Sequence, residues 1–324
     1  MPGLDILITN LLSPIVLTFV LGAVAGFMRS ELELPESVLK LLSIYLLFSI
    51  GLVGGRELAH VHVWSLLGVF GVGMLMTVLI PMITFYMLRH VGKFDVQNSA
   101  ALAAHYGSVS SVTFFAAIAF AQAAGVPADG FLAAVVAIME WGVIVSLILA
   151  RIHMMQPGNF QFKSLMLDTL RGRGILLLTG GMIIGALSTD AAWAQVSPFY
   201  EQLFRGMLML FLLEMGMTAA RQIRDFLQVG RALTMWAICA PVVFGVLGVT
   251  LAWWVGLGMG SAFVFGAICA SASYIDAPAA CRASLPQASP GIYLTASLGI
   301  TFPFNLIMGL PIYFAYAGWL FGVS

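Results

Sequence analysis

The stretch "HYGSVSSVTFF", residues 105–115, lies inside a long apolar region of the chain. It places a histidine, a tyrosine, a glycine, three serines and a threonine between "ALAA" (residues 101–104) and "AAIAFA" (residues 116–121). Glycine weakens a helix interior, and hydroxyl side chains offer the backbone alternative hydrogen bonds. We therefore predict that a buried helix is interrupted here, with Gly107 allowing the chain to leave helical geometry.

The composition predicts a protein that crosses a membrane several times. Of 324 residues, 61% are hydrophobic and 9% are charged, and the mean hydropathy is +1.02. A soluble domain has about 25% charged residues, so this chain has too few to cover a water-facing surface. The net charge is zero, which gives no indication of a nucleic-acid partner. The N-terminal "MPGLDILITN" lacks the basic region and cleavage site of a signal peptide, so we expect it to begin the mature chain.

Ten segments are apolar enough to be membrane helices, which need about 20 residues each. They are residues 6–28, 36–55, 63–88, 97–123, 128–152, 174–189, 198–219, 231–257, 260–282 and 292–321. The longest gap, within "HMMQPGNFQFKSLMLDTLRGRG" (residues 153–174), separates the fifth segment from the sixth. The prediction is an all-α membrane protein with a five-helix repeat at 1–155, a cytoplasmic linker at 156–172 and a second five-helix repeat at 173–324.

The basic residues predict how these segments are oriented. Lys and Arg concentrate at the cytoplasmic ends of membrane helices. If the N-terminus is outside, the cytoplasmic side carries all but two of the 14 basic residues, and the exceptions are Arg56 and Arg205. We therefore expect both termini outside the membrane.

Five spans in each half make the two halves enter the membrane from opposite sides, as in the inverted repeats of many secondary transporters. The spacing of matching features agrees with this arrangement. Gly51, in "LLFSIGLVGGREL", precedes Ser110 by 59 positions. Gly216, in "LFLLEMGMTAARQI", precedes Ser273 by 57 positions. The sequence thus predicts that Ser110 and Ser273 occupy corresponding places.

The counterpart of the opening stretch in the ninth segment is "CASASYIDAPAACR", residues 269–282. It is also polar and broken, with Ser271, Ser273, Asp276 and Pro278. Two interrupted spans at corresponding places indicate a transport site. The N-terminus of a half-helix directs free N–H groups and a positive dipole end toward an anion, and oxygen atoms nearby suit a sodium ion. We therefore predict a site for a small anion and for sodium.

Three acidic residues lie within the predicted spans, where an ionised side chain costs about 2.5–3.5 kcal/mol and usually has a function. Asp276, beside the ninth-span break, is the predicted cation ligand. Glu140 either completes the sodium site or carries a proton. Glu214 is predicted to be a packing or interface residue that stays protonated, with a functional role as the alternative.

Three further polar residues are candidates for the spans around the breaks. Thr301 lies 28 positions after Ser273, close to the 30 that separate Glu140 from the first break, and we assign it to the sodium site. His105 is predicted to pack between helices, with gating as the alternative. Asn305 is predicted to form an interhelical hydrogen bond, with a role in the site as the alternative.

Five motifs carry a resemblance to a known family. They are "IGLVGG" (50–55), "YGSVSSVTF" (106–114), "FRGMLMLFLLEMGMTA" (204–219), "DAPAACRASLP" (276–286) and "SPGIYLTASLGITFP" (289–303). In this order, along nearly the whole chain, the sequence resembles the sodium-dependent bicarbonate transporters first known from cyanobacteria. The resemblance implies ten spans in two inverted halves, a core domain that holds the site and a gate domain. It also implies a homotrimer in the bacterial inner membrane, with sodium-coupled import of bicarbonate at the two broken helices.

The resemblance also assigns individual residues. The family pattern Gly-Ala-Val-Ser-Gly-Ser-Thr falls on residues 107–113, which implies substrate binding by Gly107, Ser108, Val109, Ser110, Ser111 and Thr113. The family pattern Ser-Ser-Ser-Asp falls on residues 271–274, which implies substrate binding by Ser273 and Tyr274 and sodium binding by Ser271 and Ser273. An acid that is frequent in the fifth span of the family falls on Glu140.

The chain departs from the family at both breaks. Ser111 and Val112 replace a Gly-Ser pair, and Tyr274 stands where an acid is expected. The nearest acid is Asp276. These departures leave the identity of the anion and the coupling ion open.

The leading hypothesis is a secondary transporter that imports bicarbonate with sodium by alternating access. The alternatives are a transporter of another small anion or carboxylate, coupled to sodium or protons, a passive anion channel, and a sensor that binds an anion without moving it. No phosphate-binding loop and no enzyme motif is present, so we expect neither ATP drive nor catalysis, and no cofactor besides sodium. The resemblance further implies that a small PII-like signalling protein docks on the cytoplasmic face, and membrane lipid is the remaining expected partner.

Overall fold

The computed structural model describes residues 12–59, 66–154, 167, 171, 173–223, 230–275 and 277–323. Most of this part is helical, and it contains no strand. The predicted all-α class is therefore confirmed. The predicted linker lies outside the described residues except for Leu167 and Arg171.

The helices of the first half follow one another with short connections. They are α2 (Pro14–Phe27), α3 (Glu36–Leu58), α4 (Leu67–His90), α5 (Val96–Gly107), α6 (Ser111–Ala123), α7 (Leu132–Met139) and α8 (Gly142–Met154). The second half contains α10 (Arg173–Leu187), α11 (Asp190–Ser197), η2 (Pro198–Gln202), α12 (Phe204–Ile223), α13 (Arg231–Trp254), α14 (Met259–Cys269) and α15 (Ala277–Ser284). It ends with α16 (Pro290–Leu294), η4 (Thr295–Thr301), α17 (Phe302–Phe304), η5 (Asn305–Gly309) and α18 (Leu310–Leu320). The three elements labelled η are π-helical.

Seven helical stretches of the described chain are long and apolar enough to cross a membrane. They are Glu36–Leu58, Leu67–His90, Val96–Ala123, Leu132–Met154, Asp190–Arg221, Arg231–Trp254 and Pro290–Leu320. Three shorter apolar helices, α2, α10 and α14, overlap the first, sixth and ninth predicted segments. The chain is thus an integral membrane protein, whereas ten full spans in inverted repeats stay a prediction.

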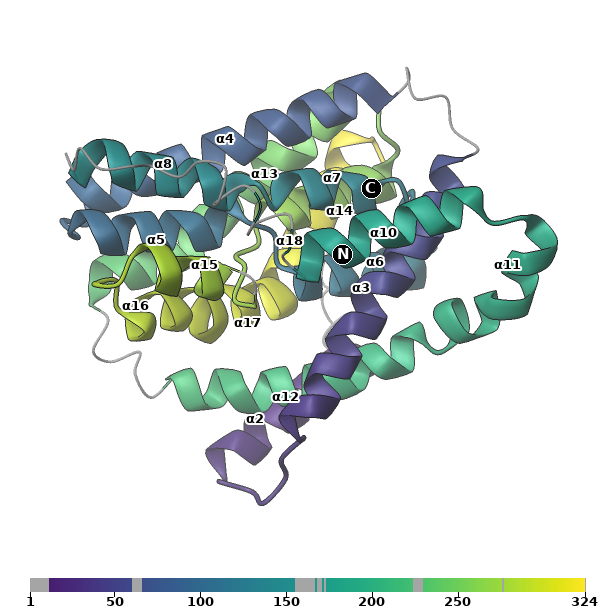
Figure 1. Cartoon of the computed structure of the whole chain (residues 1–324), viewed down its shortest axis with the longest axis horizontal. Coiled ribbons are helices and arrows are strands. Elements are labelled where there is room, and N and C mark those ends of the chain that lie inside the picture. Colours follow the sequence, from purple (N-terminus) through teal and green to yellow (C-terminus); the bar gives the residue numbers. More distant parts are fainter. Residues whose placement is uncertain are drawn as a thin grey trace.

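Helices α2 and α12, from opposite halves, pack closely along one side of the molecule (Figure 1). Glycines make this approach possible, since small residues let membrane helices come close. A Cβ on Gly22 would lie 2.0 Å from the carbonyl oxygen of Leu213, and a Cβ on Gly26 would lie 2.8 Å from that of Met217. The contacts advance together along both helices, so α2 and α12 run parallel.

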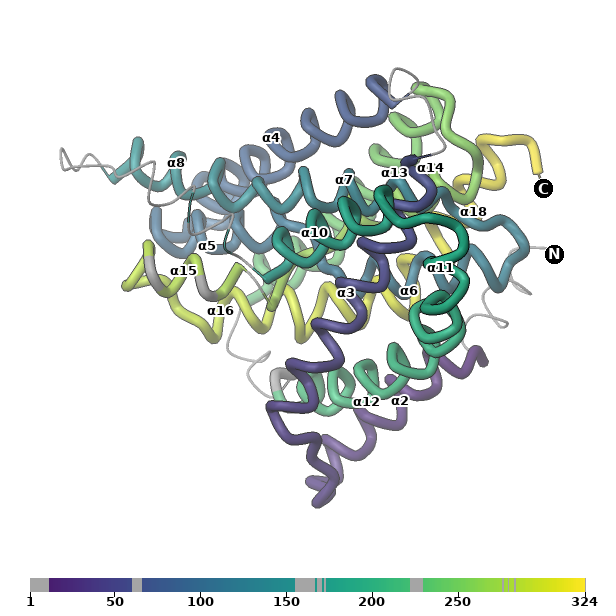
Figure 2. The backbone as a smooth tube through the Cα atoms, turned by 45° about the vertical axis from the view of Figure 1, so that its right-hand side comes forward, coloured from purple at the N-terminus to yellow at the C-terminus, as the bar shows by residue number. Residues whose placement is uncertain are grey.

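Helices α3 and α10 form a second pair of the same kind, and α3 also packs on α12 of the first pair (Figure 2). A Cβ on Gly51 would lie 2.7 Å from the carbonyl oxygen of Leu178, and a Cβ on Gly55 would lie 2.0 Å from that of Met182. This pair is also parallel. We call the four helices α2, α3, α10 and α12 the glycine pairs.

The remaining helices form a bundle, in which α4 packs on α5 and α8 while α13 packs on α14 and α18 (Figure 1). Within the stretch Val96–Ala123, which contains α5 and α6, 94% of the most apolar window is buried, against 44% for α4 and for α13. The interrupted span is therefore central, with α4 and α13 outside it. This position shields its unwound backbone from lipid, where unpaired polar groups are not tolerated.

Two polar clamps join the halves of the bundle at opposite ends of α5 and α6. Near the start of α5, the Gln97 side-chain nitrogen donates to the Gln287 side-chain oxygen at 3.0 Å, and the Gln287 amide donates to Gln97 at 2.9 Å. Beyond the end of α6, the Asp129 amide donates to the Ser261 hydroxyl at 2.9 Å, and this hydroxyl donates to the Asp129 carboxylate at 2.6 Å. Both clamps hold the two interrupted spans against each other.

Candidate functional site

The first interruption falls where the opening stretch predicts it. Helix α5 ends at Gly107, and α6 begins at Ser111, with Ser108 (φ −110°, ψ 144°) and Ser110 (φ −82°, ψ 107°) in extended conformations between them. The Ser110 hydroxyl caps α6 by accepting from the Thr113 amide at 3.3 Å. A serine is a preferred N-cap because it satisfies one of the unpaired N–H groups at a helix start.

The predicted role of Gly107 is wrong in its physical reason. Its φ is not among the positive values found in the described residues, so it does not need glycine's conformational freedom. It needs space, because a Cβ at Gly107 would lie 2.7 Å from the side chain of Pro81 in α4. On the other side, a Cβ on Gly142 would lie 1.8 Å from the Gly107 carbonyl oxygen. Glycine here allows neighbouring helices to press on the break.

The second interruption separates α14, which ends at Cys269, from α15, which begins at Ala277. The predicted cation ligand Asp276 lies outside the described residues. Asn305, on the last span, donates from its side-chain nitrogen to the Ala270 carbonyl at 2.8 Å. The predicted interhelical hydrogen bond of Asn305 is therefore confirmed, and it pairs a carbonyl that the end of α14 exposes.

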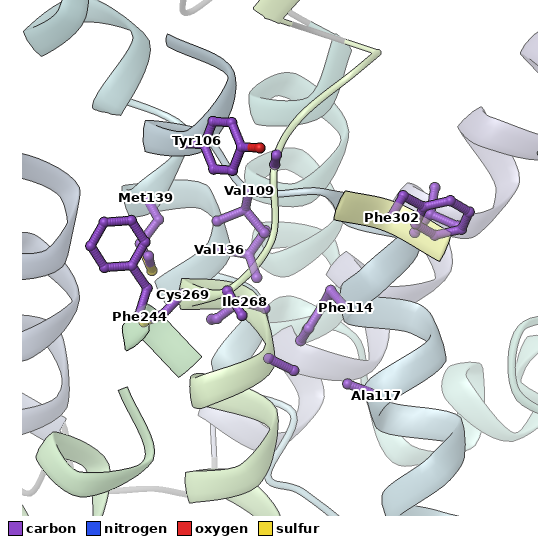
Figure 3. Close-up of a cluster of buried hydrophobic side chains, with 14 of the residues drawn as sticks. Tyr106, Val109, Phe114, Ala117, Val136, Met139, Phe244, Ile268, Cys269 and Phe302 are labelled. Atoms are coloured by element: carbon purple, nitrogen blue, oxygen red, sulfur yellow. The ribbon is translucent and has the colours of Figure 1, made fainter. Parts of the chain in front are cut away.

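The two interruptions cross, and they are joined by hydrogen bonds that backbone amides donate. The Ser110 amide donates to the Ser271 hydroxyl at 2.9 Å. The Ser273 amide donates to the carbonyl of Ser108 at 3.1 Å and to that of His105 at 2.7 Å. Figure 3 shows Val109 in the extended segment before α6, with Ile268 and Cys269 at the end of α14 beside it.

These bonds are reciprocal in the numbering that the sequence predicts. If Ser110 corresponds to Ser273, then Ser108 corresponds to Ser271. The amide of Ser110 donates to Ser271, which lies two positions before Ser273. The amide of Ser273 donates to Ser108, which lies two positions before Ser110. The acceptor is a side-chain hydroxyl in the first bond and a backbone carbonyl in the second, so the two bonds match in position but not in kind.

Glu140 reaches the crossing from the fifth span. Helix α7 ends one residue before it and α8 begins at Gly142, so this span is also interrupted. The carboxylate of Glu140 accepts from the hydroxyl of Ser108, and the residue is 4% exposed. The structure thus brings the predicted acid to the first break.

The other predicted polar residues of the spans lie beside the crossing or away from it. The Thr301 hydroxyl donates to the carbonyl of Ala237 at 2.7 Å and pairs with the Tyr106 hydroxyl at 2.7 Å, so it ties α13 and α5 to the last span. Glu214, on α12, accepts at 3.4 Å from the Leu34 amide and lies outside the crossing.

His105 is fully buried and packs, as predicted, between helices. Its ring lies 4.4 Å from that of Tyr293, and its Nδ1 bonds the Ala101 carbonyl at 2.7 Å.

Two buried hydroxyls near the crossing have no hydrogen-bond partner in the described part of the chain. They belong to Thr113, which is 2% exposed, and Tyr274, which is 8% exposed. Buried polar groups are normally paired, so unpaired ones call for an explanation such as a ligand or water. Both can donate to an anion.

The crossing combines these hydroxyls with oriented helix ends. The N-terminus of the 13-residue helix α6 offers a positive dipole end, while α5 and α14 end there with carbonyl groups. Such a place can hold an anion at the helix start and a cation at the oxygen atoms. The remaining predicted residues, Val109 and Ser111, are also buried there, at 2% and 7% exposure.

Sequence reasoning missed two residues that shape the site. Tyr106 was not considered, although it is the neighbour of Gly107 and its hydroxyl holds Thr301. Phe302 was not considered either, and its ring lies 5.3 Å from that of Tyr274. Both residues lie in motifs that carry the family resemblance, which is the signal that could have singled them out.

Comparison with protein families gives one match. The model described as the Na+-dependent bicarbonate transporter superfamily matches residues 14–318, which include every predicted site residue. No curated protein matches the chain.

Proposed function

The chain belongs to the Na+-dependent bicarbonate transporter superfamily, and from this premise we propose that it imports bicarbonate together with sodium by alternating access. Membership of a transporter family means that the protein is a membrane transporter and not an enzyme. The coupling, the site residues and the mechanism are the proposal.

The observation that carries the proposal is the reciprocal pair of hydrogen bonds at the crossing. Ser110 donates to Ser271, and Ser273 donates to the carbonyl of Ser108. Two-fold related half-helices at the centre of a membrane protein are typical of transporters built from inverted repeats. This supports two inverted five-helix repeats with interrupted fourth and ninth spans.

The pairing of the remaining helices supports the same symmetry. An inverted repeat relates the first span to the sixth and the second to the seventh. The first packs on the seventh (α2 on α12) and the second on the sixth (α3 on α10), so each pair is the image of the other. In this proposal the glycine pairs form the gate domain and the bundle forms the core domain.

We assign the anion to the N-terminus of α6. Ser110 caps this helix, Thr113 has a free hydroxyl, and Tyr274 offers another from the second break. Gly107, Ser108, Val109, Ser111 and Ser273 complete the proposed substrate site. Neutral donors at a positive helix end suit a small anion, which they hold without a basic side chain.

We assign the coupling ion to the side of the crossing where Glu140 lies. Its carboxylate supplies negative charge beside the carbonyl ends of α5 and α14, and sodium prefers such oxygen atoms. Ser271, Ser273, Asp276 and Thr301 are the other proposed ligands. The specific alternative is that Glu140 carries a proton, since a buried carboxylate is suited to proton exchange.

The expected assembly and orientation complete the proposal. The resemblance implies a homotrimer in the bacterial inner membrane and a PII-like regulator on the cytoplasmic side. The distribution of basic residues places both termini outside, and the exposed apolar faces are expected to contact lipid. Crosslinking in membranes and reagent access to cysteines introduced at the termini would test them.

Uptake of labelled bicarbonate into sealed proteoliposomes, with and without an inward sodium gradient, tests the function. The variant Thr113→Val removes only a hydroxyl that has no partner, so it should fold normally yet lower uptake about tenfold, the worth of one hydrogen bond. Thr77→Val is the matched control, because Thr77 is 5% exposed and its hydroxyl bonds its own helix at Gly73.

Each other result would point to a different function. Uptake that does not depend on sodium but increases with an inward proton gradient would mean that the coupling ion is a proton. Flux that does not saturate with bicarbonate would indicate a channel. If the wild type takes up no bicarbonate, the cargo is another small anion, to be found by thermal-shift screening.

A further inference from the structure

Tyr274 occupies a place where its hydroxyl has no structural use. The residue lies in the second break, is 8% exposed, and its hydroxyl makes no hydrogen bond within the described chain. This hydroxyl lies near the side chain of Ser110, the cap of α6. Burying a hydroxyl unpaired is unfavourable, and a bound acceptor at the start of α6 removes that penalty.

The ring of Tyr274 begins a continuous aromatic wall. It contacts the ring of Phe302 at 5.3 Å between centroids, and Phe302 contacts Phe19 edge-on at 5.4 Å and 84°. Phe302 is 1% exposed and Phe19 is 3% exposed. The wall, defined by these three rings, therefore links the crossing, through the last span, to helix α2.

The far end of this wall is held in place by backbone packing. A Cβ on Gly216 of α12 would lie 2.1 Å from the Phe19 carbonyl oxygen, so α2 and α12 are in direct contact there. Phe302 lies between the π-helical segments η4 and η5, as Figure 3 places it on α17 beside the crossing. Irregular π-helical turns are frequent at functional sites, where they position a side chain that a regular helix would place elsewhere.

We propose that Tyr274 determines the cargo: its hydroxyl donates a hydrogen bond to the anion at the α6 N-terminus, and the wall of Tyr274, Phe302 and Phe19 excludes anions larger than bicarbonate. This inference rests on the proposed function of the site and deepens it. A neutral phenol adds a donor without the repulsion that a carboxylate would exert on an anion. The proposed substrate class is a small oxyanion with an acceptor for this donor, and in this proposal the wall disfavours carboxylates that carry an alkyl chain.

The test compares bicarbonate uptake by the wild type, Tyr274→Phe and Tyr316→Phe in proteoliposomes with a sodium gradient. Tyr316→Phe is the matched control, because the Tyr316 hydroxyl bonds Thr250 and lies on α18, away from the crossing. We expect Tyr274→Phe to raise the KM for bicarbonate about tenfold, the worth of one hydrogen bond, with the half-saturating sodium concentration unchanged. An unchanged KM would overturn the hydroxyl's role, and so would a change in sodium dependence alone.

A second variant tests the wall. Tyr274→Ala removes the ring, and labelled propionate, which the wild type should reject, should then enter with the sodium gradient. Tyr274→Phe retains the ring and should still exclude propionate, which separates the size limit from the role of the hydroxyl. Equal exclusion by the alanine variant, in protein that still takes up bicarbonate, would refute the size limit. If the wild type takes up no bicarbonate, the proposed function fails first, and this inference fails with it.

Discussion

The cross-link between the two breaks can be tested by removing one hydroxyl, in the variant Ser271→Ala. The Ser271 hydroxyl accepts from the Ser110 amide at 2.9 Å and donates to the Ile268 carbonyl at 2.7 Å. That carbonyl keeps a partner in the variant, because the Ser271 amide also donates to it at 3.1 Å. The Ser110 amide keeps none, and Ser110 is only 3% exposed.

The expected loss of stability follows from this difference. Leaving a buried donor unpaired costs about 1–3 kcal/mol, so we expect the free energy of unfolding to fall by about 2 kcal/mol. Ser49→Ala is the matched control: Ser49 is 1% exposed, and its hydroxyl bonds the carbonyl of Tyr45 in its own helix at 2.7 Å. It leaves no amide unpaired, and we expect a loss below about 0.5 kcal/mol.

Reversible unfolding in mixed detergent micelles, followed by tryptophan fluorescence, measures both variants under the same conditions. A difference of at least about 1 kcal/mol between them supports the cross-link. Equal losses would refute the reasoning, because they would mean that the Ser110 amide finds another partner or that the breaks do not depend on each other.

Three further variants test other parts of the site. Glu140→Gln should raise the half-saturating sodium concentration about a hundredfold. A unit charge about 5 Å from the sodium ion contributes about 3 kcal/mol at an effective dielectric constant of about 20. If uptake by this variant instead becomes independent of pH, Glu140 is a proton carrier. Gly142→Ala should destabilise the protein by about 1–3 kcal/mol or prevent folding, because its Cβ would lie 1.8 Å from the Gly107 carbonyl oxygen. The control is Gly71→Ala, which has open space at its Cβ and should be neutral or stabilising in the same unfolding assay. Burial raises the pKa of the Asp95 carboxyl, but hydrogen bonds from Asn98 outweigh it and hold that pKa below its ordinary value, so Asp95→Ala should cost about 1 kcal/mol at neutral pH. The difference from the wild type should be complete above about pH 4 and vanish as the pH falls through the lowered pKa, and a difference that persists in acid would contradict this role of the charge.

The apolar segments and the two breaks were predictable from the chain alone, because both depend on local composition. A bilayer requires long apolar runs, and each helical stretch of the structure overlaps a predicted segment. A cluster of hydroxyls and a glycine within such a run has few explanations other than an interruption. The spacing of the halves also paired Ser110 with Ser273. This pairing agrees with the hydrogen bonds from Ser110 to Ser271 and from Ser273 to Ser108.

What each residue does at the crossing depended on contacts between distant segments, which no local pattern encodes. The need for glycine at position 107 comes from Pro81 of another helix, and not from its own backbone angle. The Thr301 hydroxyl, predicted at the sodium site, is shared between Tyr106 and Ala237.

The sequence did not predict the interruption of the fifth span at Glu140, because no proline or polar cluster marks it. It also did not predict the π-helical turns around Phe302, which depend on packing against the crossing. The bilayer acts on every residue according to its own polarity, so a linear pattern predicts where the chain crosses and where it breaks. Which hydroxyl is paired and which is free for a ligand is decided by atoms that meet only when the halves fold together.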